Sequence, residues 1–213
     1  MSRPGNIQAV LFDFDGVCAD TEPLGLQLDR EVYAYYGIEP TDEERHALVG
    51  TTGEETIPWL FRRHGMDVTA EEFWGHRRPN ELIYKEMPLQ LIPGIPELLR
   101  KLRARGIRTA LVSTTVSPSI NFALNRLGLQ AMFDIHICGD MVARHKPDPE
   151  PYLAGVAALG VNPTRCVAVE DSPTGIAAAK AASLYTLGYA GYSIHQDTSA
   201  ADETIESFVG LEL

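Results

Sequence analysis

The sequence lacks a long hydrophobic run, an excess of basic residues and a paired set of cysteines. A helix that crosses a bilayer needs about 20 consecutive apolar residues, and the apolar stretch before Asp13 is too short for the core of a signal peptide. We therefore expect a soluble, cytoplasmic protein without a membrane partner. The cysteines, Cys18, Cys138 and Cys166, form no Cys-x-x-Cys pair, which argues against a disulfide framework and a thiolate zinc site.

The charge balance is acidic, with a formal net charge of −11. Proteins that bind nucleic acids carry basic stripes that replace the counterions of the phosphate backbone, so we expect a small substrate and no nucleic-acid partner. Hydrophobic residues make up 45% of the chain and charged residues 22%, which excludes a disordered chain. A length of 213 residues suffices for one core with a modest insertion.

From residue 89 onward the chain alternates short strand-like and helix-like segments, separated by Gly, Pro and Asp. This alternation is typical of an α/β fold, and we predict a Rossmann-like, doubly wound parallel sheet. In such sheets ligands bind at the carboxyl ends of the strands. The predicted strands are a first one ending at Asp13, then 107–112, 133–138, 165–169 and 184–187, and the predicted helices follow Pro93, Pro118, Pro149 and Pro173.

The segment between the first strand and residue 89 has a helical pattern without a convincing strand. We predict a helical cap domain that is inserted into the α/β core. The boundaries give a catalytic core of residues 1–17 and 89–213 and a cap of residues 18–88. The helices expected in the cap are 24–36, 42–49, 54–64 and 70–87.

The first strand ends in two carboxylates, Asp13 and Asp15, followed by Gly16. Residues i and i+2 of an extended segment point to the same side, so both carboxylates can face a cleft at the strand end. A phosphate dianion about 4 Å from one carboxylate costs roughly 8 kcal/mol at an effective dielectric of about 20, which favours a bound divalent cation. The alternative is an ordinary turn, since Asp and Gly are common turn residues.

Polar residues near three later strand ends could complete a phosphate site. Ser113 and Thr114 precede a predicted helix, where hydroxyls and backbone amides can hold phosphate oxygens. Lys146 lies on a proline-rich loop, and Glu170 and Asp171 offer oxygen ligands that suit magnesium. Each signal alone fits a helix cap, a turn or a solvated side chain. Together they provide a metal site, a nucleophile and a phosphate clamp.

This ordered set of motifs resembles the haloacid dehalogenase superfamily, in the helical-cap branch that includes β-phosphoglucomutases and small-molecule phosphatases. The resemblance covers nearly the whole chain. It implies a magnesium-dependent phosphatase that acts on a small phosphorylated metabolite. The motifs are Asp13-Phe14-Asp15-Gly16-Val17, Ser113 with Thr114, Lys146-Pro147, and Glu170-Asp171-Ser172 followed by Gly175.

The resemblance implies roles for the matched residues in phosphoryl transfer. Asp13 is expected to be the nucleophile, and Asp15 the general acid and base. Ser113 and Lys146 are expected to bind the transferring phosphoryl group, with Thr114 as a further phosphate-binding residue. The need for an acid at position 15 weighs against dehalogenation, because a halide leaves without a proton.

The same resemblance implies a magnesium site at the strand ends. Its expected ligands are Asp13, the main-chain carbonyl of Asp15, and Asp171. Glu170 is expected to bind the metal either directly or through water.

The cap departs from the pattern of its relatives. Gly25 stands where β-phosphoglucomutases carry a cap histidine, and the loop 50–53, where they carry an arginine, reads Gly-Thr-Thr-Gly. Both departures argue against a mutase. Phosphonatases need a cap lysine, and the predicted cap has only Lys85, close to its returning hinge, so that activity is also disfavoured.

Other residues have two interpretations. Cys18 lies close to the nucleophile and is either a redox-sensitive switch or a small buried hydrophobe, and His145 replaces a glycine that is common in the family. Basic cap residues could contact an anionic or sugar substrate, although a solvated helix face is the simpler explanation. These basic residues are Arg62, Arg63, His64, His76, Arg77 and Arg78.

The leading hypothesis is hydrolysis of small phosphate monoesters, sugar phosphates among them, through an aspartyl-phosphate. A phosphomutase of the β-phosphoglucomutase type stays open. So does a phospho-accepting or binding module, because receiver domains also combine clustered aspartates, magnesium and lysine, although the helical insert and Asp15 disfavour it. The expected assembly is a monomer or a weak homo-oligomer.

Overall fold

The computed structural model describes residues 1–48, 51, 53–191, 193–194 and 196–213. The chain forms two compact units, one of residues 1–22 and 83–213 and the other of residues 23–82. Among the described residues, no helix combines the length and the apolar character that crossing a membrane requires.

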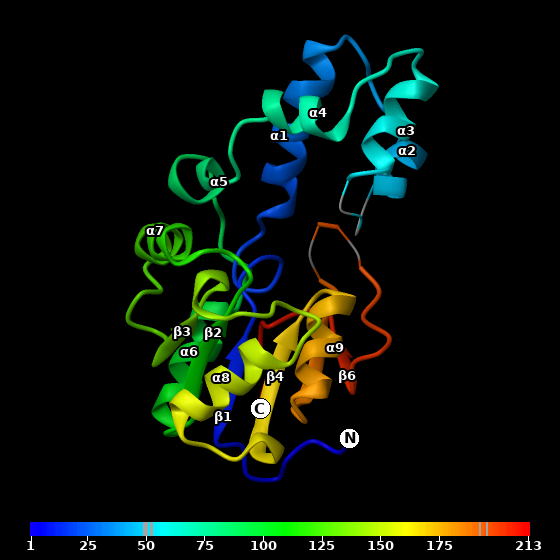
Figure 1. Ribbon diagram of the computed structural model, residues 1–213. Helices are drawn as coiled ribbons and strands as arrows, with labels where there is room; N and C mark the ends of the chain where they lie inside the picture. Colours follow the sequence, from blue (N-terminus) through cyan, green and yellow to red (C-terminus); the bar gives the residue numbers. More distant parts are fainter. Residues whose placement is uncertain (49–50, 52, 192, 195) are drawn as a thin grey trace. The chain divides into compact units, whose positions relative to one another are not determined.

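The larger unit contains a six-stranded sheet in the order β3-β2-β1-β4-β5-β6, and every neighbouring pair is parallel (Figure 1). The central strand β1 pairs with β2 on one side and with β4 on the other. The predicted doubly wound α/β fold is therefore confirmed. The strands are β1 (Ala9–Phe12), β2 (Arg108–Val112), β3 (Ile135–Ile137), β4 (Cys166–Glu170), β5 (Tyr185–Tyr189) and β6 (Glu203–Ile205).

Helices cover both faces of this sheet. Alternate residues of a strand point to opposite faces, and Ala9, Leu11 and Ala110 share one buried cluster with residues of α8 (Glu150–Leu159) and α9 (Pro173–Ala181). The helix α6 (Ile95–Ala104) also contacts β2, but its buried residues do not belong to that cluster, which places α6 on the other face. The remaining helices of this unit are α7 (Ser117–Leu127) and the 3-10 turns η1 (Gly139–Met141) and η2 (Pro163–Arg165).

Two strands differ from the sequence-based expectation. The predicted strand 133–138 is reduced to the three residues of β3. The Asp134 carboxylate accepts a hydrogen bond from the Thr109 backbone N–H, the Asp134 backbone N–H donates to the Thr109 carbonyl, and regular pairing with β2 begins at Ile135. The edge strand β6 was not predicted. Its three residues carry no apolar alternation, so that their extended form depends on pairing with β5.

The smaller unit is helical and has its own aromatic core, in which the Tyr33 ring lies 6.2 Å from Phe61 and 5.5 Å from Phe73. The single helix predicted over 70–87 is wrong. The chain leaves the helix at Arg77 and resumes at Glu81, because Pro79 disfavours helical backbone in the residue before it. The helices from residue 22 to residue 85 are α1 (Glu22–Tyr35), α2 (Asp42–Leu48), α3 (Thr56–Arg63), α4 (Ala70–His76) and α5 (Glu81–Lys85).

Candidate active site

The carboxyl ends of three adjacent strands carry the polar residues of the candidate site. Phe12 of β1 is in register with Leu111 of β2 and Val169 of β4, so the residues that follow these positions leave the sheet at the same edge. Asp13 directly follows β1, and its backbone N–H donates to the carbonyl of Val169 at 3.0 Å. Ser113 follows β2, and its backbone is held by the neighbouring strand β3.

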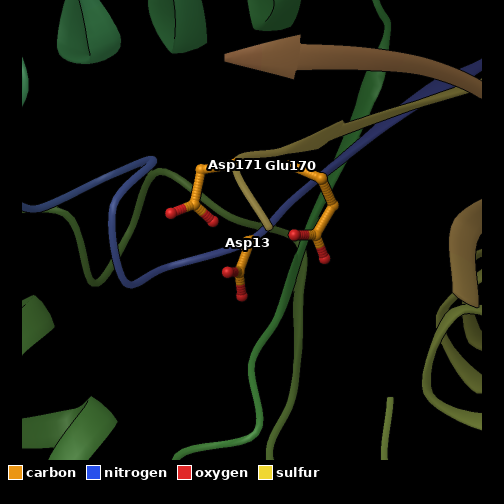
Figure 2. Close-up of side chains that lie close together, drawn as sticks. All are labelled: Asp13, Glu170 and Asp171. Atoms are coloured by element: carbon orange, nitrogen blue, oxygen red, sulfur yellow. The ribbon is translucent and has the colours of Figure 1, made fainter. Parts of the chain in front are cut away.

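Three buried carboxylates gather at this edge (Figure 2). Each of Asp13, Glu170 and Asp171 offers an oxygen, and these oxygens all lie within 4.8 Å of one another. Close carboxylates repel one another unless a cation or a proton intervenes. Three carboxylate oxygens match the hard oxygen donors that Mg²⁺ prefers, so this cluster fits a divalent cation.

Lys146 supplies a positive charge beside the cluster. Its Nζ donates to Asp13 Oδ1 at 2.9 Å, to Glu170 Oε1 at 2.6 Å and to the carbonyl of Val112 at 2.9 Å. The side chain is only 4% exposed. Burial acts to lower the pKa of Lys146, but the charges of Asp13 and Glu170 outweigh it and hold that pKa above its ordinary value. The ammonium group is therefore charged.

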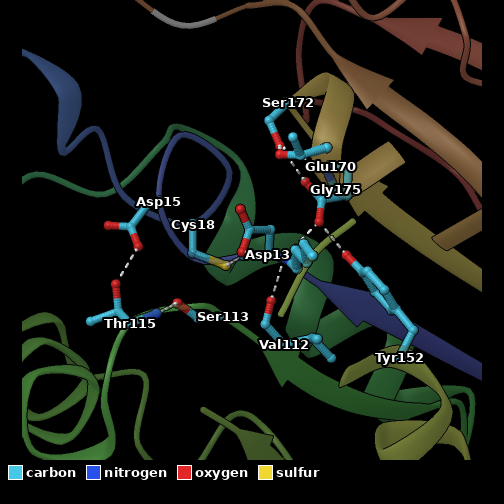
Figure 3. Close-up of polar contacts among 12 residues, drawn as sticks. Asp13, Asp15, Cys18, Val112, Ser113, Thr115, Tyr152, Glu170, Ser172 and Gly175 are labelled. Carbon is cyan, nitrogen blue, oxygen red and sulfur yellow. Dashed lines mark hydrogen bonds and ion pairs between the residues drawn. The ribbon is translucent and has the colours of Figure 1, made fainter. Parts of the chain in front are cut away.

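Glu170 is held by a second donor, Tyr152 of α8. The Tyr152 hydroxyl donates to Glu170 Oε1 at 2.5 Å (Figure 3). Burial raises the pKa of Glu170, and the ammonium of Lys146 opposes that rise. Tyr152 is fully buried, and the position of its hydroxyl was not predicted from the sequence.

Two glycines allow the backbone to approach the acidic cluster closely. Gly16 has a φ of +76°, and a Cβ there would lie 2.1 Å from Asp171 Oδ2. At Gly175, in the first turn of α9, a Cβ would lie 2.0 Å from Glu170 Oε2. No other residue type leaves room for these carboxylates, which explains why glycine follows both acidic motifs.

We expect Gly175→Ala to weaken divalent cation binding by about tenfold or more, since displaced groups around a metal typically cost 10–100-fold in affinity. The added methyl group would push the Glu170 carboxylate out of the cluster. The measurement is the Mg²⁺ dependence of thermal stability. Gly75→Ala is the matched control, because a Cβ there meets nothing within 4 Å. Equal Mg²⁺ affinities in the two variants would contradict the prediction.

Asp15 lies apart from the carboxylate cluster and is bound by hydroxyl groups. Tyr84 donates to Asp15 Oδ1 and Thr115 donates to Asp15 Oδ2, each at 2.9 Å. Burial raises the pKa of Asp15, and the charge of Asp13 adds to the rise, while hydrogen bonds from Thr21, Tyr84 and Thr115 oppose it. The environment thus favours a neutral acid more than bulk water does.

The three hydroxyl residues that follow β2 have different environments. Ser113 is buried and its Oγ accepts from the Thr115 backbone N–H at 3.0 Å. Thr114, which was predicted to bind phosphate, is exposed. Thr115 contacts Asp15 and was not among the predicted site residues. The run of three hydroxyl residues at a strand end was a sequence signal that could have identified Thr115. The sequence pattern held no such signal for Tyr84.

Cys18 supports the loop rather than presenting a reactive thiol. Its Sγ donates to the carbonyl of Asp13 at 3.1 Å, and the residue is fully buried. Burial raises the pKa of the Cys18 thiol well above its ordinary value, and the charges of Asp13 and Asp15 add to this rise. Since thiolates are the reactive form, the hypothesis of a redox switch is not supported, and the interpretation as a small buried residue stands.

Most of the basic cap residues with a described partner are paired within the smaller unit. Arg63 Nε donates to Glu44 Oε1 at 2.9 Å, and His64 Nε2 lies 3.3 Å from the other oxygen of Glu44. Arg77 pairs with Asp29. In the same unit Arg78 pairs with Glu31 at 2.7 Å, and the His76 ring stacks on Tyr35 with centroids 4.3 Å apart.

The sequence analysis used two further cap features, Lys85 against a phosphonatase and the loop 50–53 against a mutase. Lys85, the predicted cap lysine, places its Nζ 4.7 Å from the centre of the Phe122 ring. In the loop 50–53, Gly50 and Thr52 lie outside the described residues.

Comparison with known proteins agrees with this geometry. The family model described as haloacid dehalogenase-like hydrolase matches residues 10–189. The chain is 35% identical to a phosphorylated carbohydrates phosphatase of Thermotoga maritima, over 84% of this chain and 82% of that protein. It is 30% identical to the β-phosphoglucomutase of Bacillus subtilis, over 85% of this chain and 83% of that protein.

A solved structure is also similar. A mutant of CbbY from Rhodobacter sphaeroides in complex with xylulose-(1,5)-bisphosphate superposes with a TM-score of 0.71 at 32% identity, covering 95% of each chain. The chain belongs to the haloacid dehalogenase-like hydrolases. It is a phosphatase of this family, related to the β-phosphoglucomutase-like members, as the sequence predicted.

Proposed function

We propose that the protein hydrolyses small phosphate monoesters, with sugar phosphates as the substrate class, by transferring the phosphoryl group to Asp13. The observation that carries the proposal is the position of Asp13 Oδ1, 2.9 Å from a buried ammonium and within 4.8 Å of oxygens of Glu170 and Asp171. An anionic nucleophile beside fixed positive charge and a candidate cation site suits attack on an anionic phosphate ester.

We assign the candidate cation site to Mg²⁺. Asp13, Asp171 and the main-chain carbonyl of Asp15 would hold it, with Glu170 binding directly or through water. When bound, the ion supplies positive charge that neutralises phosphoryl oxygens during transfer. The donor set of buried carboxylates supports this assignment.

In the first half-reaction, an Asp13 carboxylate oxygen attacks phosphorus in line with the departing ester oxygen. The bond from Asp13 to phosphorus forms as the bond from phosphorus to the ester oxygen breaks. Lys146 and Ser113 hold phosphoryl oxygens, with Thr114 as a further contact. Asp15 gives its proton to the departing alkoxide, which leaves as an alcohol.

In the second half-reaction, Asp15 acts as a carboxylate. It accepts a proton from a water molecule, whose oxygen attacks the phosphorus of the aspartyl-phosphate. The bond from phosphorus to the Asp13 oxygen breaks, inorganic phosphate leaves, and both carboxyl groups return to their starting states. The raised pKa of Asp15, caused first by burial, suits a group that alternates between the two forms.

A phosphomutase is the second candidate, favoured by the similarity to a β-phosphoglucomutase. A mutase returns the phosphoryl group to a second hydroxyl of the substrate, whereas a hydrolase gives it to water. Gly25 in place of a cap histidine supports the hydrolase.

We further propose that the core of residues 1–17 and 89–213 carries the reacting groups and that the inserted residues 18–88 select the substrate. We infer a cytoplasmic protein that is a monomer or weak homo-oligomer and that has no nucleic-acid partner. The net charge of −11 supports the last point.

The test is phosphate release from a panel of hexose and pentose monophosphates, with the sugar product identified by chromatography. We expect Mg²⁺-dependent release of free sugar and phosphate, a loss of at least about 100-fold with excess EDTA, and recovery when Mg²⁺ is restored. An isomeric sugar phosphate as the main product would favour the mutase. Turnover that EDTA leaves unchanged would contradict the magnesium assignment.

A further inference from the structure

We infer that Tyr84 and Thr115 are positioning residues that orient both oxygens of Asp15 for its proton transfers. The inference rests on the proposed function, in which Asp15 is the general acid and base. The phosphoryl-transfer steps proposed above use neither of these two hydroxyl groups.

The three side chains form a closed ring of short contacts. Tyr84 Oη lies 2.9 Å from Asp15 Oδ1, Thr115 Oγ1 lies 2.9 Å from Asp15 Oδ2, and the two hydroxyl oxygens lie 3.1 Å apart. In Figure 3, Asp15 and Thr115 lie on one side of Asp13, and Glu170 lies on the other. A carboxylate with one donor on each oxygen cannot rotate without breaking a hydrogen bond. These two hydroxyl groups therefore restrict its orientation, together with the hydrogen bond from the Thr21 side chain.

The backbone around Tyr84 is fixed by a third side chain. Arg126 of α7 donates to the carbonyl of Tyr84 at 2.8 Å and to the carbonyl of Met87 at 2.7 Å. Tyr84 is 7% exposed, and its ring centroid lies 6.3 Å from that of Phe14, the neighbour of Asp15. The tyrosine hydroxyl is therefore held on a rigid support, as a positioning group requires.

A general acid matters most when the leaving group is a poor one. Loss of orientation at Asp15 should therefore slow esters of alcohols more than esters of acidic phenols. A hydroxyl that served only folding would change stability and leave the relative rates of the two kinds of substrate unchanged. The leaving-group dependence separates these two roles.

The experiment measures kcat/KM for glycerol 1-phosphate and para-nitrophenyl phosphate in Tyr84→Phe, Thr115→Val and Thr115→Ser. We expect Tyr84→Phe and Thr115→Val to lower kcat/KM for glycerol 1-phosphate by about tenfold or more. Their loss on para-nitrophenyl phosphate should be smaller than that loss by a factor of at least about three. Thr115→Ser, which keeps the hydroxyl, should retain the wild-type ratio. Tyr185→Phe is the matched control, since its hydroxyl donates to Glu203 at 2.8 Å and should leave both rates unchanged.

The Asp15→Asn variant distinguishes failure of the inference from failure of the proposed function. If Asp15→Asn loses equally on both substrates, the acid role of Asp15 is wrong. If Asp15→Asn shows the leaving-group dependence while Tyr84→Phe and Thr115→Val do not, the positioning role alone is wrong. Thermal unfolding of each variant identifies losses of activity that arise from misfolding. If Tyr84→Phe misfolds, the comparison of Thr115→Ser with Thr115→Val tests the positioning role.

Discussion

Replacing Asp13 by asparagine is expected to abolish phosphate release. Asparagine keeps the volume and one carbonyl oxygen, but its neutral amide is a poor nucleophile toward phosphorus, so the covalent step fails. We expect kcat to fall by at least about 10⁴-fold, the scale of losses when a nucleophile is removed. Phosphate release at saturating Mg²⁺ measures the loss, and circular dichroism reports whether the fold is intact.

The matched control for this substitution is Asp197→Asn, which alters an exposed aspartate that hydrogen-bonds its sequence neighbour Ser199. It should turn over at the wild-type rate. Mass spectrometry of enzyme quenched during turnover gives an independent readout. The wild type should carry one added phosphoryl group, and Asp13→Asn should carry none. A variant with near-wild-type turnover would show that another group accepts the phosphoryl group.

Lys146→Met is expected to lower both turnover and the stability of the metal-free protein. Methionine keeps the length of the stem but leaves the carboxylates of Asp13 and Glu170 without their ammonium partner. Removing one partner of a buried ion pair typically costs about 3–5 kcal/mol in the free energy of unfolding. We expect kcat to fall by about 10²–10³-fold, as when an oxyanion donor is removed.

Chemical denaturation with and without Mg²⁺ tests the electrostatic cause. A bound cation neutralises the same carboxylates, so Mg²⁺ should restore part of the stability that Lys146→Met loses. Lys101→Met is the matched control, because Lys101 pairs with Glu212 while the two side chains are 38% and 72% exposed, and such surface pairs are worth about 1 kcal/mol or less. Equal stability of the two variants without metal would argue against the role of the buried ammonium.

The strand ends could be predicted because two simple regularities combine. Apolar runs mark the strands, and parallel topology brings their carboxyl ends to one edge. Asp13, Lys146, Glu170 and Asp171 were identified in this way, and the structure brings their side chains together. Their roles in catalysis remain predictions until the substitutions above are measured.

Side chains that support these residues could not be recognised in the same way. Tyr152 has the pattern of a core residue of an amphipathic helix, and Tyr84 lay inside a predicted helix over 70–87 that the structure divides near Pro79. Whether a tyrosine hydroxyl reaches a carboxylate depends on atoms placed within about 3 Å. Such precision comes from the packing of helices against the sheet rather than from residue spacing.

The basic cap residues show a second limit of sequence patterns. Clustered arginines such as Arg77 and Arg78 could equally have faced a substrate. They follow the end of α4 and pair with Asp29 and Glu31 of α1. Such pairing depends on how these segments pack, and a charge pattern along one segment cannot report it.

The sequence by itself determined the strands β1 to β5 and the helices between them in the larger unit, the acidic pairs at the strand ends and the glycines beside them, because these depend on local backbone preferences and on apolar patterning. Tertiary structure alone decided which hydroxyl groups bind Asp15 and Glu170 and how each charge is compensated. The physical reason is that hydrogen bonds and buried ion pairs act over only a few ångströms in space. The segments that they join are distant in the chain, so only the folded structure brings them within that distance.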